Sequence, residues 1–182
     1  MPGPMALVKG YAGKPSHPPL TDVSIGAYTA GVAMLVLGAI GFQEEPMAHG
    51  ALLTISAGLL VALPTALTGL LDWLDIPRRT PARKLGWVHL GAMLTATVLF
   101  AATWLLHLQG YRAGEVTTPA LVAGLIAEAV LAGGGYLGGT LAYVYGVRVL
   151  KNPTTRVADA LVPGRADHAS PPHPDDAADT AP

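Results

Sequence analysis

The segment VSIGAYTAGVAMLVLGAIGF, residues 23–42, contains no charged side chain. As an α-helix that rises ~1.5 Å per residue, a segment of this length reaches ~30 Å, the thickness of the hydrocarbon core of a bilayer. Its apolar residues form one continuous block, whereas the helices of a soluble core alternate apolar and polar faces. The segment is therefore predicted to be a transmembrane helix.

Three further apolar blocks follow, at about residues 51–71, 85–108 and 119–147. A threonine–proline pair stands at the start of two of them, Thr80-Pro81 and Thr118-Pro119, and such pairs favour helix starts because the missing proline N–H needs no partner there. The connections between blocks are short, so consecutive helices are expected to be antiparallel neighbours. The predicted fold class is all-α, an integral membrane four-helix bundle.

The composition supports the same interpretation. Hydrophobic residues make up 51% of the 182 residues and charged residues only 13%, about half the share in a soluble domain. The net charge of −1 gives no basic bias toward nucleic acid, and the absence of cysteine excludes disulfides, thiolate-held metals and thiol catalysis. The sequence contains no phosphate-binding glycine loop, nucleophile elbow, zinc-protease helix or EF-hand loop.

The basic residues gather on one side of the predicted bundle. Nine Lys and Arg residues flank one set of helix ends, and Arg112 alone lies on the other side. Because positive residues concentrate in cytoplasmic loops, the N- and C-termini are both predicted to face the cytoplasm. The nine residues are Lys9, Lys14, Arg78, Arg79, Arg83, Lys84, Arg148, Lys151 and Arg156.

This topology divides the chain into three parts. Residues 1–21 are predicted to be a cytoplasmic N-terminal segment, and residues 22–149 the four-span transmembrane domain. Residues 150–182 are rich in Pro, Ala and Asp and have too few apolar residues to bury a core, so we expect a disordered cytoplasmic tail. The high Ala, Gly and Pro content is typical of GC-rich bacterial genomes, and the predicted location is the bacterial cytoplasmic (inner) membrane.

Polar side chains inside a bilayer are costly, so each requires an explanation. One interpretation is a polar site at the inner leaflet, with His89 as a ligand or proton acceptor and Asp72 or Asp22 orienting its ring. The other is a set of interfacial residues within reach of water. Eight residues are predicted to form this polar layer, near the cytoplasmic ends of the helices: His17, Asp22, Asp72, Asp75, His89, Thr140, Tyr143 and Tyr145.

Two pairs of histidines lie at matching predicted depths. His89 and His107 are 18 residues apart, which is five turns at ~3.6 residues per turn, so they share one face of the third helix. Pairing His17 with His89 inside and His49 with His107 outside gives the facing imidazoles that ligation of b-type haem requires. The alternative is that these histidines are ordinary interfacial residues near the ends of helices.

The fourth span carries two further features. Glu128 lies well within the hydrocarbon, so it must face the bundle interior, be protonated or pair with Thr or Ser of another span; it is either a proton relay or a packing residue. The same span contains Gly-xxx-Gly spacings, which let two helices approach closely. Three roles stay open for this face: packing within the bundle, contact between two copies of the chain, or a seat for a planar cofactor. Its glycines are Gly134, Gly135, Gly138 and Gly139.

Four motifs are spread over the chain: GKPSHPPLTD at residues 13–22, LTGLLDW at 67–73, His89 early in the third span, and GGYLGG at 134–139. Together they resemble the uncharacterised bacterial membrane-protein family known as domain of unknown function 2231, over about residues 11–149. The resemblance implies a four-span membrane domain. Some relatives join this domain to Rieske-type iron–sulfur domains, which implies electron transfer. Many relatives have a histidine where this chain has Thr140, so a haem site here rests on His17 and His89.

Three hypotheses follow for the function. The first is a membrane redox component that binds b-type haem and passes electrons to or from a redox protein. The second is a protein that handles protons or small solutes through Glu128, Asp72 and His89. The third is a non-catalytic scaffold subunit that packs against another membrane subunit. None of the three requires the chain to be an enzyme on its own.

Overall fold

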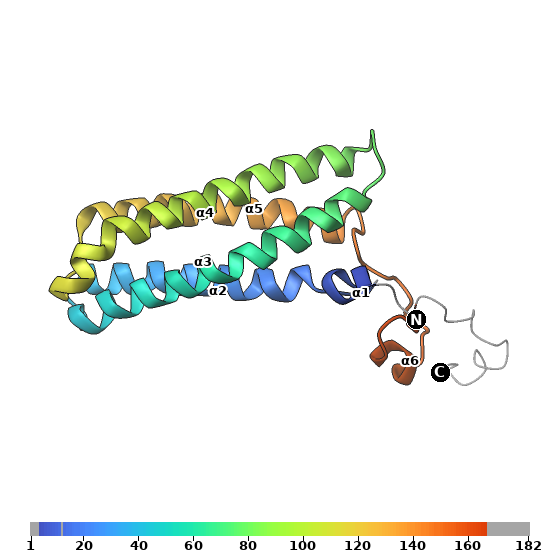
Figure 1. Ribbon diagram of the computed structural model, residues 1–182, viewed down its shortest axis with the longest axis horizontal. Coiled ribbons are helices and arrows are strands. Elements are labelled where there is room, and N and C mark those ends of the chain that lie inside the picture. The colour runs from blue at the N-terminus through green and yellow to red at the C-terminus, as the bar shows by residue number, and fades with distance from the viewer. Residues whose placement is uncertain (1–3, 12, 167–182) are drawn as a thin grey trace, which may run out of the picture.

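The computed structural model describes residues 4–11 and 13–166 as a long bundle of four helices with short elements at one end (Figure 1). The long helices are α2 (His17–Ala39), α3 (Glu44–Asp75), α4 (Pro81–Ala113) and α5 (Thr118–Tyr143). The short elements are α1 (Pro4–Lys9), the strands β1 (Gly10–Tyr11) and β2 (Lys14–Pro15), and α6 (Val157–Leu161). The four long helices are long and apolar enough to cross a membrane, which confirms the predicted fold class.

The helix ends differ from the predicted blocks by several residues. α2 starts at His17, so this histidine belongs to the helix and does not precede it. The start of α4 is as predicted, because the Thr80 hydroxyl accepts a hydrogen bond from the Arg83 N–H at 3.2 Å. At α5 the capping position is occupied by Thr117, one residue earlier than expected. α5 ends before residue 147, since the chain turns through a left-handed conformation at Gly146 (φ 69°).

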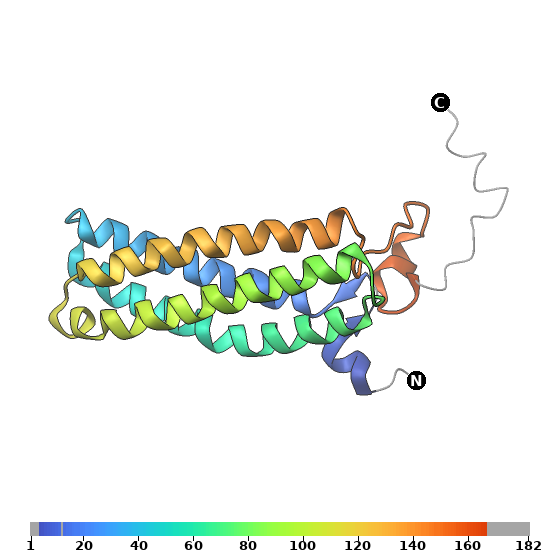
Figure 2. The same ribbon diagram turned by 90° about the horizontal axis from the view of Figure 1, so that it is seen from above.

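The long helices associate as two hairpins. α2 packs mainly against α3, and α4 mainly against α5, whereas fewer contacts join the two hairpins. Viewed from above, α4 and α5 run side by side along the length of the bundle (Figure 2). Because neighbouring helices are antiparallel, the starts of α2 and α4 and the ends of α3 and α5 lie together (Figure 1).

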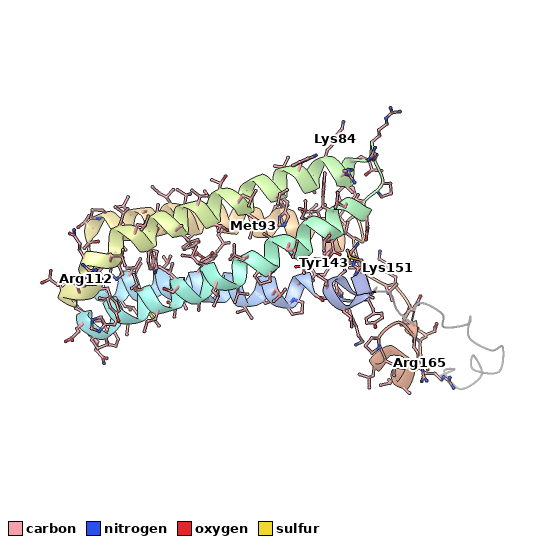
Figure 3. The ribbon with its side chains drawn as sticks, in the orientation of Figure 1. Lys84, Met93, Arg112, Tyr143, Lys151 and Arg165 are labelled. Atoms are coloured by element: carbon pink, nitrogen blue, oxygen red, sulfur yellow. The ribbon has the colours of Figure 1, made fainter. Side chains whose placement is uncertain are left out.

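We call this end of the bundle the basic end, because Lys84 and Lys151 lie there, while Arg112 lies at the opposite, far end (Figure 3). The separation of basic residues expected from the sequence is thus present in three dimensions. Which end faces the cytoplasm stays a prediction. Of the predicted tail, residues 150–166 include α6, which has no buried residue; residues 167–182 lie outside the described residues.

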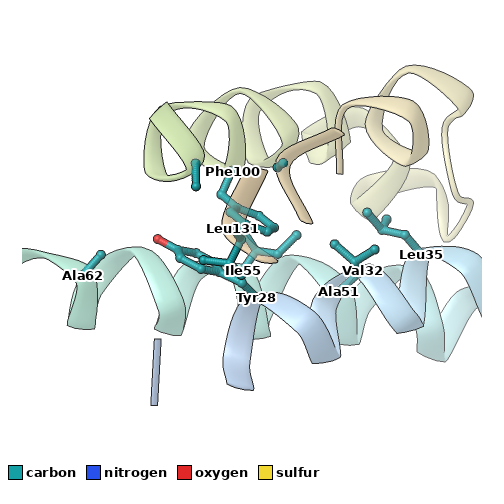
Figure 4. Packing of buried hydrophobic residues seen from close by; sticks show 10 residues of the cluster. Tyr28, Val32, Leu35, Ala51, Ile55, Ala62, Phe100 and Leu131 are labelled. Atoms are coloured by element: carbon teal, nitrogen blue, oxygen red, sulfur yellow. The ribbon is translucent and has the colours of Figure 1, made fainter. Parts of the chain in front are cut away.

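The middle of the bundle and its far half are closely packed. Leu35, Ile55 and Phe100 are each 0% exposed, and small residues such as Ala96 and Ala127 let the helices approach one another closely. The ring of Tyr28 stacks on Phe100, with centroids 4.0 Å apart and planes within 2° (Figure 4). This stack marks the point beyond which the interior is no longer filled.

Candidate functional site

A cavity of about 330 Å³ lies between the two helix hairpins at the basic end. All four long helices contribute to its wall. Thr140 is not part of the wall; its hydroxyl donates to the Tyr136 carbonyl of its own helix at 3.0 Å. The cavity brings together five of the eight residues of the predicted polar layer: His17, Asp22, Asp72, His89 and Tyr143. Asp75 and Tyr145 do not line it.

Helical periodicity explains why these residues meet. Residues spaced by three or four positions lie on one face of a helix, and the lining residues of each helix follow that spacing. The face on α2 is His17, Thr21, Ser24 and Tyr28; the face on α3 is Thr65, Gly69 and Asp72; and the face on α4 is His89, Met93 and Thr97. Three helices therefore each turn a face that carries polar side chains among apolar ones toward one interior space.

His17, at the start of α2, is held by α3. Its Nδ1–H donates to the Thr65 carbonyl at 3.0 Å. A carbonyl only accepts, so Nδ1 carries the proton and Nε2 of the neutral ring keeps its lone pair. The ring lies against Gly69, where a Cβ atom would stand only 2.6 Å from Cε1 of His17. The LTGLLDW motif therefore supplies the space for this imidazole at Gly69, and Thr65, one helical turn before it, supplies the carbonyl.

His89, on α4, is held by α5 in the same way. Its Nδ1–H donates to the Gly134 carbonyl at 2.9 Å, which again leaves Nε2 unprotonated. A Cβ atom on Gly138 would stand 2.9 Å from Cε1 of His89. Gly134 is also tightly packed, since a Cβ there would meet the Met93 sulfur at 2.6 Å. Both glycines thus pack within the bundle; contact between two copies of the chain stays a prediction.

Tyr28 is a site residue that the sequence analysis missed. Its side chain is 2% exposed, and its hydroxyl has no hydrogen-bond partner within the described residues. Figure 4 shows the hydroxyl directed toward Ala62 and away from Val32. Tyr28 lines the cavity and ends it at the packed core. The signal was present in the sequence, because Tyr28 follows His17 by 11 residues, about three helical turns.

Arg148 is a second site residue that the sequence analysis missed. It was considered there only as one of the basic residues that predict which side of the membrane is cytoplasmic. Its Nε lies 3.2 Å from Oδ1 of Asp72, and both side chains are largely buried. The distance makes this an ion pair, although the angles fall short of a directed hydrogen bond. Arg148 Nη2 also donates to the carbonyls of Lys9 and Gly10, at 2.9 and 3.0 Å. Lys9 in turn forms an ion pair with Asp75.

The two far-end histidines serve to join helices. His107 is fully buried, and its Nε2–H donates to the Ala48 carbonyl at 2.9 Å. The Nε2–H of His49 donates to the Tyr111 carbonyl at 2.9 Å, and its ring packs on the Tyr111 ring with centroids 4.7 Å apart. Neither histidine lines the cavity. Haem ligation by this pair stays a prediction, and these contacts between α3 and α4 do not support it.

Glu128 pairs with a hydroxyl of another helix, one of the options that the sequence left open. The Thr29 hydroxyl on α2 donates to Glu128 Oε1 at 2.8 Å. Glu128 Oε2 is buried without a partner among the described residues. Glu128 does not line the cavity, so the structure separates this acid from the two cavity histidines.

The fold and the cavity together define a multi-pass helical membrane protein, whose outer helix faces are surrounded by lipid. The chain belongs to the family described as predicted membrane protein (DUF2231), whose family model matches residues 13–151. The matched range contains all four long helices, and each of the four sequence motifs contributes residues to the cavity wall. The comparisons with curated proteins and with solved structures gave no match.

Proposed function

We propose that this protein is a membrane redox component that binds b-type haem in the cavity, where His17 and His89 would hold it. One observation carries the proposal. Two imidazoles from different helix hairpins line one cavity, and in each the Nδ1–H is held by a backbone carbonyl. Such a hydrogen bond fixes the ring and makes the remaining Nε2 a better metal ligand.

The residues present fit such a group. Imidazole nitrogens are common axial ligands of haem, and two suffice, whereas no three His, Asp or Glu side chains in the described part of the chain form a metal-binding group. The cavity volume of about 330 Å³ falls at the lower end of the ~300–1,000 Å³ range of ligand pockets. Leu94 lines the cavity and is 48% exposed in the middle of the membrane-spanning helix α4, so the cavity also opens toward the lipid.

The roles of the chain's own groups follow from their contacts. The Thr65 and Gly134 carbonyls orient the two imidazoles, and Gly69 and Gly138 leave room for the rings. The apolar helices exclude water from the surroundings, which influences the redox potential of any bound group. When bound, a haem supplies reversible one-electron transfer.

The direction of electron transfer depends on topology. We propose that the basic end faces the cytoplasm of a bacterial cell, because the positive residues gather there. A redox protein then exchanges electrons with the site at that end. This orientation is supported by the distribution of charge along the chain.

An absorption spectrum tests the proposal. Protein purified from haem-supplied cells is expected to show a Soret band, which His17→Ala and His89→Ala each reduce at least fivefold per protein. His49→Ala is the matched control, because this histidine lies outside the cavity, and it is expected to leave the band unchanged. The absence of a Soret band in the unaltered protein, or its full retention in both cavity variants, would contradict haem binding.

A second candidate function is favoured by Glu128. A buried carboxylate oxygen without a partner is typical of groups that handle protons in membranes. Glu128→Gln keeps an acceptor for Thr29 but cannot release a proton. Proton flux through liposomes containing the protein is expected to fall at least tenfold in this variant, with Glu115→Gln in the α4–α5 connection as the control. A flux that Glu128→Gln leaves unchanged would remove this candidate.

A further inference from the structure

A second hollow, of about 420 Å³, lies beside the histidine cavity at the basic end. It is formed by the end of α3, the start of α4 and residues 145–148. The two hollows share four lining residues, namely Asp72, Ile76, Val147 and Arg148. A single thin wall therefore separates the inner cavity from the outer hollow, and the Asp72–Arg148 ion pair is part of this wall.

The ion pair is largely removed from solvent. The side chain of Asp72 is 8% exposed and that of Arg148 is 20% exposed, at a separation of 3.2 Å. Removing two charges from water carries a large desolvation penalty, which their attraction offsets only while they stay together. The wall is therefore closed when the pair is formed, and water must hydrate both charges when the pair separates.

The two residues of the ion pair belong to different kinds of backbone segment. Asp72 belongs to the last turn of α3, whereas Arg148 lies on irregular chain after α5, in a left-handed conformation (φ 61°) that is uncommon for a residue with a side chain. The Arg148 carbonyl accepts a hydrogen bond from the Gly13 N–H at 3.2 Å. Together with the guanidinium contacts to Lys9 and Gly10, this bond ties Arg148 to the N-terminal segment. The arginine side of the wall is thus bonded to the N-terminal segment, whereas the aspartate side belongs to a helix.

We propose that the Asp72–Arg148 pair is a gate that admits water and protons from the outer hollow to the histidine cavity. The outer hollow is lined by charged and hydroxyl groups, including Asp75 and Thr80, so it suits water. Beyond the wall lie the two neutral imidazoles, whose Nε2 atoms accept protons. The other two lining residues that the hollows share, Ile76 and Val147, are apolar, so the ion pair supplies the only charges among the described residues between the two hollows. The gate does not depend on haem binding.

Thiol labelling tests the gate directly, because the natural chain has no cysteine. Ser24→Cys places a near-isosteric thiol on a cavity-lining residue that is 4% exposed. The probe is a small trimethylammonium methanethiosulfonate, whose fixed charge prevents passage through detergent or lipid. The labelling is done on detergent-solubilised protein purified without added haem. With the natural pair intact, the Ser24→Cys thiol is expected to react slowly.

Neutralising either partner is expected to open the wall. Arg148→Gln and Asp72→Asn should each raise the labelling rate of the Ser24→Cys thiol at least tenfold, whereas Arg148→Lys, which keeps the charge, should stay within about threefold of the natural pair. Ala82→Cys lines only the outer hollow and is expected to react rapidly in every background. Thr103→Cys is fully buried and lines neither hollow, so it reports general loosening of the bundle.

Two results would overturn the proposal. One is a Ser24→Cys rate that is the same with the natural pair and with both neutral variants. The other is an equal rise at Thr103→Cys, which would show that the ion pair holds the bundle together and does not control one passage. Either result leaves the haem proposal untouched, because that proposal is tested by the spectrum of the loaded protein.

Discussion

The imidazole ring of His89 lies directly against Gly138, at a distance where a Cβ atom on that glycine would stand 2.9 Å from Cε1. His17 lies against Gly69 in the same manner, at 2.6 Å. Each histidine is held by the other helix of its own hairpin, His17 within α2–α3 and His89 within α4–α5. Because the cavity lies between the hairpins, the two imidazoles approach it from opposite sides.

This relationship makes Gly138 a sensitive position. Gly138→Ala places a methyl group inside normal van der Waals contact with the ring, so His89 must move and haem binding is expected to fall at least threefold. Gly133→Ala is the matched control on the same helix, because a Cβ there meets nothing within 4 Å. The measurement is the haem-to-protein ratio after purification. Equal ratios in the two variants would contradict the role of Gly138.

Tyr28 offers a test of the unpartnered hydroxyl. Tyr28→Phe keeps the stack on Phe100 and removes a buried polar group without a partner, so the free energy of unfolding should stay the same or rise by up to about 1 kcal/mol. Tyr28→Ala also removes the ring and should cost about 3–5 kcal/mol. Denaturant unfolding in detergent measures both. A loss of more than about 2 kcal/mol in Tyr28→Phe would show that the hydroxyl does have a partner.

Substituting the far-end histidines should lower the free energy of unfolding and leave haem binding unchanged. His107→Ala removes the hydrogen bond to the Ala48 carbonyl and opens a space in a fully buried position, at an expected cost of about 2–4 kcal/mol in the free energy of unfolding. His49 is partly buried, so His49→Ala should lower the free energy of unfolding by about 1 kcal/mol. Unfolding curves and Soret absorbance per folded protein are measured together. Loss of haem at unchanged stability would instead support the predicted pair of His49 and His107.

Substitutions of two nearby aspartates on α3 are expected to lower the free energy of unfolding by very different amounts. Asp72→Ala leaves the charge of Arg148 buried and uncompensated, which should cost about 3–5 kcal/mol. Asp75 pairs with Lys9 but its side chain is 56% exposed, so Asp75→Ala should cost no more than about 1 kcal/mol. Unfolding in detergent compares the two variants. Similar losses would mean that the Asp72–Arg148 pair is not the buried interaction described above.

Topology is tested by labelling intact cells. A single cysteine at Ala113→Cys, at the far end of α4, is expected to react with an impermeant thiol reagent added outside. The matched variant Arg79→Cys, in the connection before α4, is expected to react only after the cells are opened. The reverse pattern would place the basic end outside.

The sequence predicted the four helices because each is a long apolar block, and such blocks have few alternatives to a transmembrane helix. It also predicted that His17 and His89 belong to one polar layer. Depth along a helix can be counted from residue numbers, and His17 and His89, which were grouped in this way, line the same cavity. Which residues at one depth come into contact also depends on the direction in which each points around its helix axis. His49 and His107 also lie at similar depth, yet neither of them lines the cavity.

Two site residues could not be found from depth alone. Tyr28 lies in an apolar segment and is typical of a core residue, and only its spacing from His17 indicates the cavity face. Arg148 contacts Lys9, which is 139 residues away, through a turn after α5 that no apolar pattern predicts. Its importance depends on how two surface segments meet, and such long-range contacts leave no local signal in the sequence.

The most direct test of the haem site is the electron paramagnetic resonance spectrum of the oxidised, haem-loaded protein. Ligation by His17 and His89 predicts a low-spin ferric signal typical of two imidazoles, and either His17→Ala or His89→Ala should convert it to a high-spin signal. A high-spin signal in the unaltered protein, or a low-spin signal that survives both substitutions together, would contradict ligation by these two histidines.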